Sequence, residues 1–440
     1  MSKLVKYDVG TNFDYKLFDI IRENDKDHRI KNVYGKLKND GLQGGRSTSI
    51  IPYLTIDEFA AYVQACKDND LTFNYLINPL CMDQNELDPD KGKEMRDFIH
   101  SAYDVGVRYF TINSPTLIKY VKSEFKDVFV TLGLYAYPVS IQQVEYWRNW
   151  GVDEITLDHS FNRNFDLLKK TLKFYKDSDF CLRLIANNFC LKECPFRLNH
   201  GSFCSHSDPK KVSMDFNLIN CTYRKVSNPK AMLTSEWIRP EDVHYYEELA
   251  EETGNKNFSL KLVDRTRSTE FIGNVIKAYT SESYDGNLLD IINWPNTKSM
   301  LFASKMGGPL GVQGGPPAGA PPVSGGPAGG PPKDLPPMRF AERMNHEFFP
   351  KYGRTMNFPN IYIDNKKLDG FIDHFINNNN CANSLCAGTI IEDGRECSYS
   401  CNYCGKWAEK VVSYDKEEVD QWLAVSSEIL KALQSGGMYK

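Results

Sequence analysis

Eight short β-like runs alternate with helical patterns over the first two-thirds of the chain, and this alternation constrains the fold more than any other feature. The runs are KLVKYDV, IKNVYGKL, TFNYLIN, RYFTIN, VFVTLGL, EITLD, CLRLIAN and SLKLV. Thr55 and Glu58 form a capping-box pattern before one helical segment, and Ser140 and Gly151 suit the two ends of another. Alternating β and α segments predict parallel strands covered by helices, and eight units predict a TIM-like (β/α)8 barrel. A doubly wound open sheet is the alternative, although no G-x-G-x-x-G motif follows an early strand.

A barrel would gather the residues that follow each strand at one end, where the active sites of TIM barrels lie. These residues are Asn78, Asn113, Tyr135, Asp158, His159, Asn187, Asn188, Asp264, Arg265 and Arg267. About seventy residues separate the seventh and eighth runs, far more than an ordinary loop contains. Because this insertion also starts at the catalytic end, we expect it to be functional.

Composition divides the chain into three regions. Residues 307–337 contain ten Gly and ten Pro, which predicts a disordered or polyproline-like linker. We expect the barrel at residues 1–306 and a cysteine-rich region at 338–440. That last region ends in the helical pattern DKEEVDQWLAVSSEILKALQS, which we interpret as a core-packing helix, with docking or oligomerisation as the alternative.

Charge and hydropathy limit the classes of partner. The formal net charge is −4, which argues mildly against a large RNA. The sequence contains no run of about 18 apolar residues, the length that a membrane span requires. The start, MSKLVKYDVG, has no apolar signal region or cleavage site, so we expect a cytoplasmic protein. Disulfides are rare in that compartment, and grouped cysteines therefore indicate metal, cluster or redox roles.

The insertion carries the first cysteine group, in the stretch NNFCLKECPFRLNHGSFCSHS and just beyond it. The ligand candidates are Cys190, Cys194, Cys204 and Cys221. Four thiolates suit zinc or an iron–sulfur cluster. The C-x3-C spacing is looser than a zinc knuckle, and Pro195 follows the second cysteine, a feature that recurs beside cluster ligands. A redox disulfide and unligated thiols are the alternatives, and His200 and His206 are further candidate ligands or proton carriers.

A second cysteine group lies near the end of the chain. Its candidate ligands are Cys381, Cys386, Cys401 and Cys404, with Cys397 as a spare. The last three of these five cysteines in chain order also match the C-x3-C-x2-C motif of radical S-adenosylmethionine enzymes, but that motif normally follows the first strand of a barrel. We interpret the scattered Cys66, Cys81 and Cys181 as small buried side chains.

Several motifs resemble peptidase family U32. They are NNFCLKECPFRLNH, NC at 220–221, SEWIRPEDVHYYEEL and LKLVDRTRSTEFIGNVIKAY, together with VYGKLKNDGLQGGR and YLINPLC. The resemblance implies a TIM-like barrel that holds a [4Fe–4S] cluster through four cysteines. Some members carry collagenase names, whereas others act in oxygen-independent hydroxylation of RNA or of a small metabolite. On this resemblance Cys190, Cys194 and Cys221 match the family cysteines best, and Cys204 is the nearest fourth.

We therefore expect an iron–sulfur enzyme that hydroxylates or otherwise modifies RNA or a small anionic metabolite. Its candidate catalytic residues are Asp264, Arg265, Arg267 and His200; the two arginines follow the last strand, where barrels bind anionic groups. Arg197 and Arg239 could join them, or the arginines could pair with acids such as Asp264 and Glu241.

Two other functions remain open. One is a peptidase or zinc hydrolase, although the sequence contains no G-x-S-x-G motif, no H-E-x-x-H motif and no evident Cys/His pair. A non-catalytic electron-transfer subunit is the third class. We also expect a U32 partner subunit or homodimer and an electron donor as candidate partners, and a second cluster in the C-terminal region.

Overall fold

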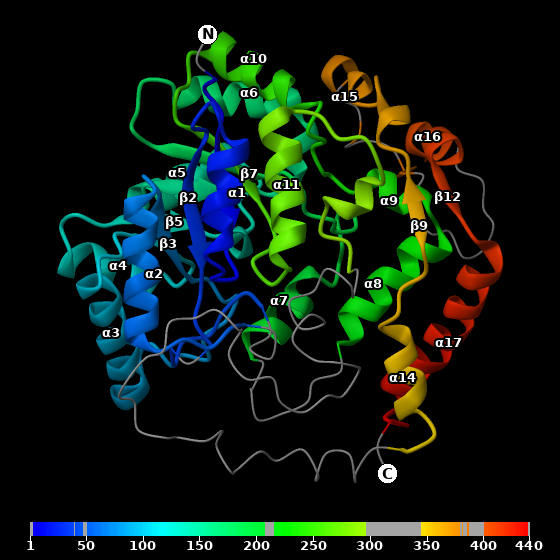
Figure 1. Ribbon diagram of the computed structural model, residues 1–440, viewed down its shortest axis with the longest axis horizontal. Coiled ribbons are helices and arrows are strands. Elements are labelled where there is room, and N and C mark those ends of the chain that lie inside the picture. Colours follow the sequence, from blue (N-terminus) through cyan, green and yellow to red (C-terminus); the bar gives the residue numbers. More distant parts are fainter. Residues whose placement is uncertain are drawn as a thin grey trace.

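The computed structural model describes residues 3–38, 40–46, 51–206, 215–295, 345–378, 381, 385–386 and 400–438. Its centre is a closed barrel of eight parallel strands in sequential order (Figure 1). The strands are β1 (Lys6–Gly10), β2 (Ile30–Gly35), β3 (Thr72–Ile77), β4 (Tyr109–Ile112), β5 (Phe129–Leu132), β6 (Glu154–Thr156), β7 (Cys181–Ile185) and β8 (Phe258–Leu262). Tyr7 of β1 pairs with Leu260 of β8 and closes the ring. The predicted barrel is confirmed, and the open sheet is excluded.

Helices cover the outside of the barrel, one after most strands. They are α1 (Lys16–Asn24), α2 (Ile56–Asp68), α3 (Pro89–Asp104), α4 (Pro115–Glu124), α5 (Ile141–Trp150), α6 (Phe165–Phe174) and α11 (Thr269–Ser281), with short 3-10 turns η2 (Leu134–Ala136), η3 (His159–Arg163) and η4 (Leu288–Asp290). The predicted caps are present: Thr55 and Glu58 form a reciprocal capping box, and the Ser140 side chain accepts from the Gln143 N–H. Gly151 ends α5 with φ 111°, a conformation that suits glycine.

The barrel interior has a polar layer below an apolar one. Arg183 Nη1 lies 2.6 Å from Asp8 and 2.9 Å from Glu154, so this buried guanidinium pairs with two carboxylates. Above them, four buried side chains pack as a small cluster: Tyr34, Leu76, Ile185 and Val263. This cluster separates the ion-pair layer from the carboxyl ends of the strands.

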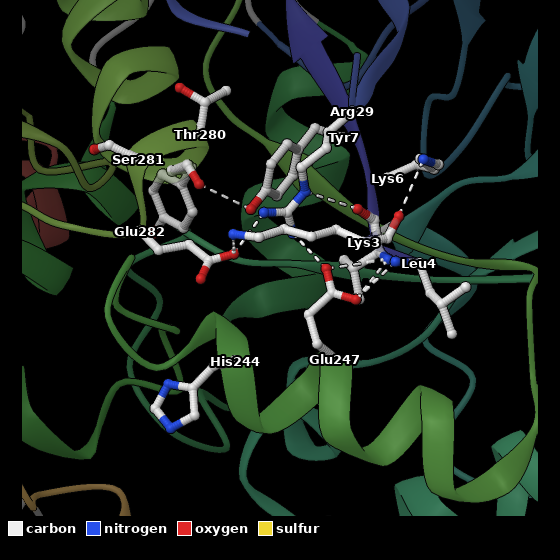
Figure 2. Close-up of polar contacts among 12 residues, drawn as sticks. Lys3, Leu4, Lys6, Tyr7, Arg29, His244, Glu247, Thr280, Ser281 and Glu282 are labelled. Atoms are coloured by element: carbon white, nitrogen blue, oxygen red, sulfur yellow. Dashed lines mark hydrogen bonds and ion pairs between the residues drawn. The ribbon is translucent and has the colours of Figure 1, made fainter. Parts of the chain in front are cut away.

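The opposite end of the barrel is closed by a second polar network (Figure 2). Glu247 accepts hydrogen bonds from the backbone N–H groups of Leu4 and Val5, and it lies 2.6 Å from Arg29 Nη2. The other side of the Arg29 guanidinium contacts Glu282, which also pairs with Lys3 at 2.6 Å. The network ties the chain before β1 to the helices before and after β8. Residues at this end of a TIM barrel generally serve stability.

The insertion between β7 and β8 folds into four helices. They are α7 (Arg197–Ser205), α8 (Phe216–Ser227), α9 (Lys230–Thr234) and α10 (Val243–Thr253). The helices α7 and α8 contact each other, although residues 207–214 between them lie outside the described residues. All four cysteines of the first group lie on this insertion, as predicted.

The C-terminal region packs against the barrel and the insertion. Its elements are α14 (Phe349–Thr355), β9 (Ile361–Ile363), η6 (Lys366–Leu368), α15 (Asp373–Asn378), β10 (Leu385–Cys386), β11 (Ser400–Cys401), α16 (Tyr403–Val411), β12 (Val412–Tyr414) and α17 (Lys416–Ser435). Figure 1 shows this orange and red part alongside α8 and α9, where α17 contacts α8 and α16 contacts α9. Ile429 and Leu430 of α17 share a buried cluster with Ile219 of α8. The terminal helix is thus a core-packing helix, as interpreted from its apolar spacing.

The predicted Gly/Pro linker at 307–337 and both predicted boundaries beside it lie outside the described residues. None of the helices in the described ranges combines the length and the apolar character that spanning a bilayer requires.

Candidate functional site

A cavity of about 670 Å³ opens at the carboxyl ends of the strands, and we call it the mouth cavity. Eight of the predicted mouth residues line it: Asn78, Tyr135, Asp158, His159, Asn188, Asp264, Arg265 and Arg267. The insertion forms another part of its wall, and all four cysteines of the first group face it. The predicted gathering of these residues at one end of the barrel is therefore confirmed for these eight positions.

Asn113 and Asn187 follow strands as predicted but do not line the mouth cavity. Asn187 is fully buried; its Nδ2 donates to Ile291 O at 3.0 Å, and its Oδ1 accepts from Val263 N at 2.7 Å. Asn113 Oδ1 accepts from Gly133 N at 2.8 Å. Both amides satisfy backbone groups in the loops, because a buried turn needs partners for its unpaired N–H and C=O groups.

The four cysteines reach the mouth cavity from three parts of the insertion. Cys190 and Cys194 lie in the segment between β7 and α7, Cys204 lies on α7, and Cys221 lies on α8. Burial raises the pKa of the Cys194 thiol, a backbone hydrogen bond with Phe196 opposes this effect, and the charges of Cys221 and Cys190 raise the pKa further. Within the described ranges, no three His, Cys, Asp or Glu side chains converge on the position of a single metal ion.

The donor set fits an iron–sulfur cluster. Four thiols around a common cavity are the usual ligands of a [4Fe–4S] cluster. Thiolates are soft ligands, which suit iron–sulfur clusters and zinc alike.

Cys190 is paired with a histidine that the sequence did not reveal. The side-chain amide of Asn188 lies 3.2 Å from Cys190 Sγ and 2.6 Å from His159 Nε2. Burial raises the pKa of Cys190, but the hydrogen bond and charge of His159 and the charges of Lys225 and His200 outweigh it, so the pKa falls to about 6. The lowered pKa favours the thiolate, the form that both a metal ligand and a nucleophile require. The sequence shows no evident Cys/His pair because His159 and Cys190 follow different strands.

His200 lines the mouth cavity from α7, as predicted for a catalytic candidate. Its Nε2 lies 3.7 Å from Asp215 Oδ2, and its ring also hydrogen-bonds Cys204. Burial lowers the pKa of His200, but these two partners raise it more, to about 11. A histidine held in its charged form supports a neighbouring thiolate. His206 ends α7, is exposed and does not line the cavity.

Arg265 presents the chemistry of an anion site. Its Nε and Nη2 atoms are buried and have no hydrogen-bond partner, and the side chain faces the mouth cavity. Asp264, the acid next to it, instead pairs with Arg46, whose Nε lies 2.9 Å from Asp264 Oδ2. A buried guanidinium with free donors is costly unless an acceptor binds it. Pairing of Arg265 with Asp264, the competing interpretation, is therefore not observed.

The other arginines are occupied. Arg267 Nη2 donates to Asn293 Oδ1 at 2.8 Å and to Trp294 O at 2.7 Å, so it holds the segment after η4. Arg197 pairs with Asp158 at 2.7 Å at the edge of the cavity. Arg239 pairs with Asp242 at 2.7 Å and donates to Asn365 O at 2.8 Å, away from the cavity. For Arg239, pairing with an acid is the correct interpretation, although the acid is not Glu241.

No family model matches the chain. A protein of Methanocaldococcus jannaschii named uncharacterized protease MJ1657 is 27% identical over 282 residues, which cover 61% of this chain and 80% of that protein. The solved structure of the U32 peptidase Mk0906 is 17% identical, covers 60% of this chain and 94% of that one, and gives a TM-score of 0.43.

The chain resembles peptidase family U32. The shared portion amounts to about three-fifths of the chain.

The second cysteine group lies in the C-terminal region. Cys386 of β10 pairs in register with Cys401 of β11, and Cys404 follows on α16, where it is buried. Cys381 is partly buried against the main core. The side chain of Cys386 and the whole of Cys397 lie outside the described residues. Among the described residues, none of the ten cysteines with described side chains forms a disulfide with another.

Of the three scattered cysteines, only Cys66 is buried as predicted. Cys81 is exposed and Cys181 is half-buried, so the interpretation of Cys81 as a core residue was wrong. Cys81 lies in the loop after β3, where the apolar run has already ended.

Three cations of the mouth cavity were missed in the sequence: Arg46, Lys225 and Lys261. Lys225 lies four residues after Cys221 on α8, so the helical spacing could have placed it beside the cysteines. Lys261 lies at an inward-facing position of β8, but no sequence motif marks an inward-facing lysine in an apolar strand. Arg46 lies in an irregular loop, where the sequence has no helical or strand periodicity that could indicate the direction of a side chain.

Proposed function

We propose that this protein is an iron–sulfur enzyme of the U32 type that modifies a small anionic substrate in the mouth cavity, most simply by oxygen-independent hydroxylation. The observation that carries the proposal is the shared cavity: four thiols and the unpartnered Arg265 guanidinium face the same space. Soft ligands for a cluster and a free donor for an anion are thus adjacent.

Cys190, Cys194, Cys221 and Cys204 would hold the cluster. With all four as ligands the cluster would supply electrons, and with Cys204 unligated it would also present an open iron that acts as a Lewis acid. His159 and Lys225 favour the thiolate form of Cys190, and Lys225 Nζ also donates to Phe189 O in the segment just before it. The chain itself therefore prepares at least one ligand in the deprotonated state that binding requires.

The size of the mouth cavity supports a small substrate. Its volume of about 670 Å³ lies within the common range of small-molecule sites. Arg265 would bind a carboxylate or phosphate of the substrate through its free nitrogens. The net charge of −4 gives no general attraction to RNA, which remains the alternative substrate.

Anaerobic purification with iron, sulfide and zinc analysis tests the proposal. We expect iron and sulfide in equal amounts, and we expect Cys190→Ser, Cys194→Ser and Cys221→Ser each to remove about four atoms of both. Cys181→Ser is the matched control, because that thiol lies outside the mouth cavity and should retain the metal. Stoichiometric zinc without sulfide would contradict the proposal.

A cysteine peptidase is the second candidate, favoured by the contacts of Cys190. The thiol is hydrogen-bonded to His159, and Asn188 contacts both side chains. A nucleophile, a base and an orienting amide in mutual contact are the components of papain-like catalysis. The relative from Methanocaldococcus jannaschii also carries the word protease in its name.

Two substitutions separate the candidates. Cys194→Ser should remove the iron bound at the mouth cavity and spare a peptidase that uses Cys190, whereas His159→Asn should abolish such a peptidase and spare most of that iron. Peptidase activity is measured by the hydrolysis of fluorescent casein and of a peptide library. If the Cys194→Ser protein hydrolyses these substrates and the His159→Asn protein does not, the peptidase is established and the cluster enzyme is overturned.

A further inference from the structure

Lys261 lies at the floor of the mouth cavity, and the proposed function does not use it. It lies on β8, is 7% exposed and lines the same cavity as Arg265. Its Nζ lies 3.8 Å from the centre of the Tyr34 ring. The Tyr34 hydroxyl donates to Leu262 O at 2.8 Å, so this ring is fixed in position. The amine therefore packs against a fixed ring, and the Lys261 side chain lines the cavity.

The charged groups around Lys261 leave it without an acidic partner. Asp8 and Glu154 are the nearest acids, but both form ion pairs with Arg183. Within the described part of the chain, no carboxylate forms an ion pair with Lys261. Burial lowers the pKa of Lys261 well below its ordinary value, and the charges of Arg183 and Arg265 lower it further against the opposing effect of Asp8 and Glu154. This environment favours the neutral amine.

Lys36 shows what an ordinary buried lysine looks like in the same barrel. Its side chain is also fully buried, but its Nζ pairs directly with Asp40. Lys36 does not line the mouth cavity. Burial alone is thus not what distinguishes Lys261; the difference is a missing acid and an open cavity in front of the amine.

We propose that Lys261 is a nucleophile that forms an imine with a carbonyl compound bearing a carboxylate, with Arg265 binding the carboxylate. The Nζ lone pair attacks the carbonyl carbon and forms the C–N bond. The carbonyl oxygen leaves as water with the two amine protons, so the step needs no oxidant, reductant or further reactant. A desolvated lysine is the usual amine for this chemistry.

The substrate class follows from the two cations. Lys261 selects a carbonyl group, and the free Nε and Nη2 of Arg265 select a planar anion. A 2-oxo acid is the simplest molecule that carries both groups. This inference goes beyond the proposed function, because imine formation does not require the cluster.

Reductive trapping tests the proposal. The full-length protein, purified anaerobically, is incubated at pH 7 with pyruvate or 2-oxoglutarate and sodium cyanoborohydride, and adducts are located by intact mass and peptide mapping. We expect one dominant adduct on Lys261, with Lys36 unmodified. Lys261→Arg should lose that adduct, and Arg265→Met should lower its rate at least tenfold with pyruvate but much less with propanal, a neutral carbonyl compound.

Two controls make the outcome decisive. Lys261→Met replaces Lys261→Arg if the latter does not fold, as judged by thermal melting. Wild-type protein from which a chelator has removed the iron should still form the adduct on Lys261, so failure of the cluster proposal and failure of this one are distinguishable. Adducts spread over surface lysines, or no adduct on Lys261, would overturn the inference.

Discussion

Arg46 Nε lies 2.9 Å from Asp264 Oδ2, and this ion pair joins the loop after β2 to the loop after β8. Burial raises the pKa of Asp264, but Arg46, Arg267 and Arg265 outweigh burial and hold the pKa far below its usual value. The Asp264 Oδ1 atom accepts from both the N–H and the hydroxyl of Thr266. Asp264 is thus a permanently charged positioning residue, and the pair leaves Arg265 free for an anion.

The first prediction concerns this pair. Asp264→Asn removes the negative charge that three arginines share, and we expect it to lower the free energy of unfolding by about 2 kcal/mol. It should also weaken binding of carboxylates, because Arg46 and the loop lose their anchor. Urea unfolding and isothermal titration with citrate measure the two effects.

Thr266→Ala is the matched control, since it removes only one neutral hydrogen bond to the same carboxylate. We expect it to cost about 1 kcal/mol and to leave anion binding nearly unchanged. An Asp264→Asn protein of wild-type stability that has lost activity would assign the carboxylate a chemical role instead.

The second prediction is the contribution of Glu282 to stability at acid pH (Figure 2). Burial raises its pKa, but the hydrogen bonds from Lys3 and Arg29 outweigh burial, and the pKa is lower than usual. A carboxylate with a lowered folded-state pKa stabilises the protein above its unfolded pKa of about 4.3, and that stability is lost as the pH falls below it. Glu282→Gln should therefore cost about 1–2 kcal/mol at pH 7 and much less at pH 3.

Thermal melts of the wild type and of Glu282→Gln from pH 7 to pH 3 measure this difference. Asp166→Asn provides a control, because that carboxylate forms an exposed pair with Lys170 on one helix. Parallel curves for Glu282→Gln and the wild type would show that the network does not contribute in this way.

The sequence predicted the barrel because its signal is periodic. Each strand is an apolar run between helical patterns, and Thr55 and Ser140 mark helix starts by local hydrogen bonds that need no tertiary information. The position of the first cysteine group also followed, since chain order alone places the segment after β7 at the mouth. The interaction partners of the polar side chains at the site could not be predicted from the sequence. Arg46 and Asp264 are more than two hundred residues apart, and His159 and Cys190 come from loops after different strands.

The third prediction concerns the packing of α17 on α8. Ile429 is fully buried and shares a cluster with Ile219, which lies two residues before Cys221. Ile429→Ala should cost about 3 kcal/mol because it leaves a cavity at this contact. Since α8 carries Cys221, the variant should also lose iron faster when a chelator is added. Leu433→Ala, a substitution at a partly buried position on the same helix, is the control. Equal rates of iron loss would show that α17 does not support the site.

The fourth prediction concerns a second cluster in the C-terminal region, which we propose from the cysteine positions. Cys386 and Cys401 are paired in register on adjacent strands, and Cys404 lies three residues further on, so the chain places three thiol-bearing positions together. Iron should then amount to about eight atoms per chain, and Cys401→Ser should lower it to about four. Cys190→Ser should remove the other four, and a double variant should bind almost none. Cys66→Ser, a buried thiol in α2, should change neither number. Four irons in both the wild type and Cys401→Ser would show that the C-terminal cysteines hold no cluster.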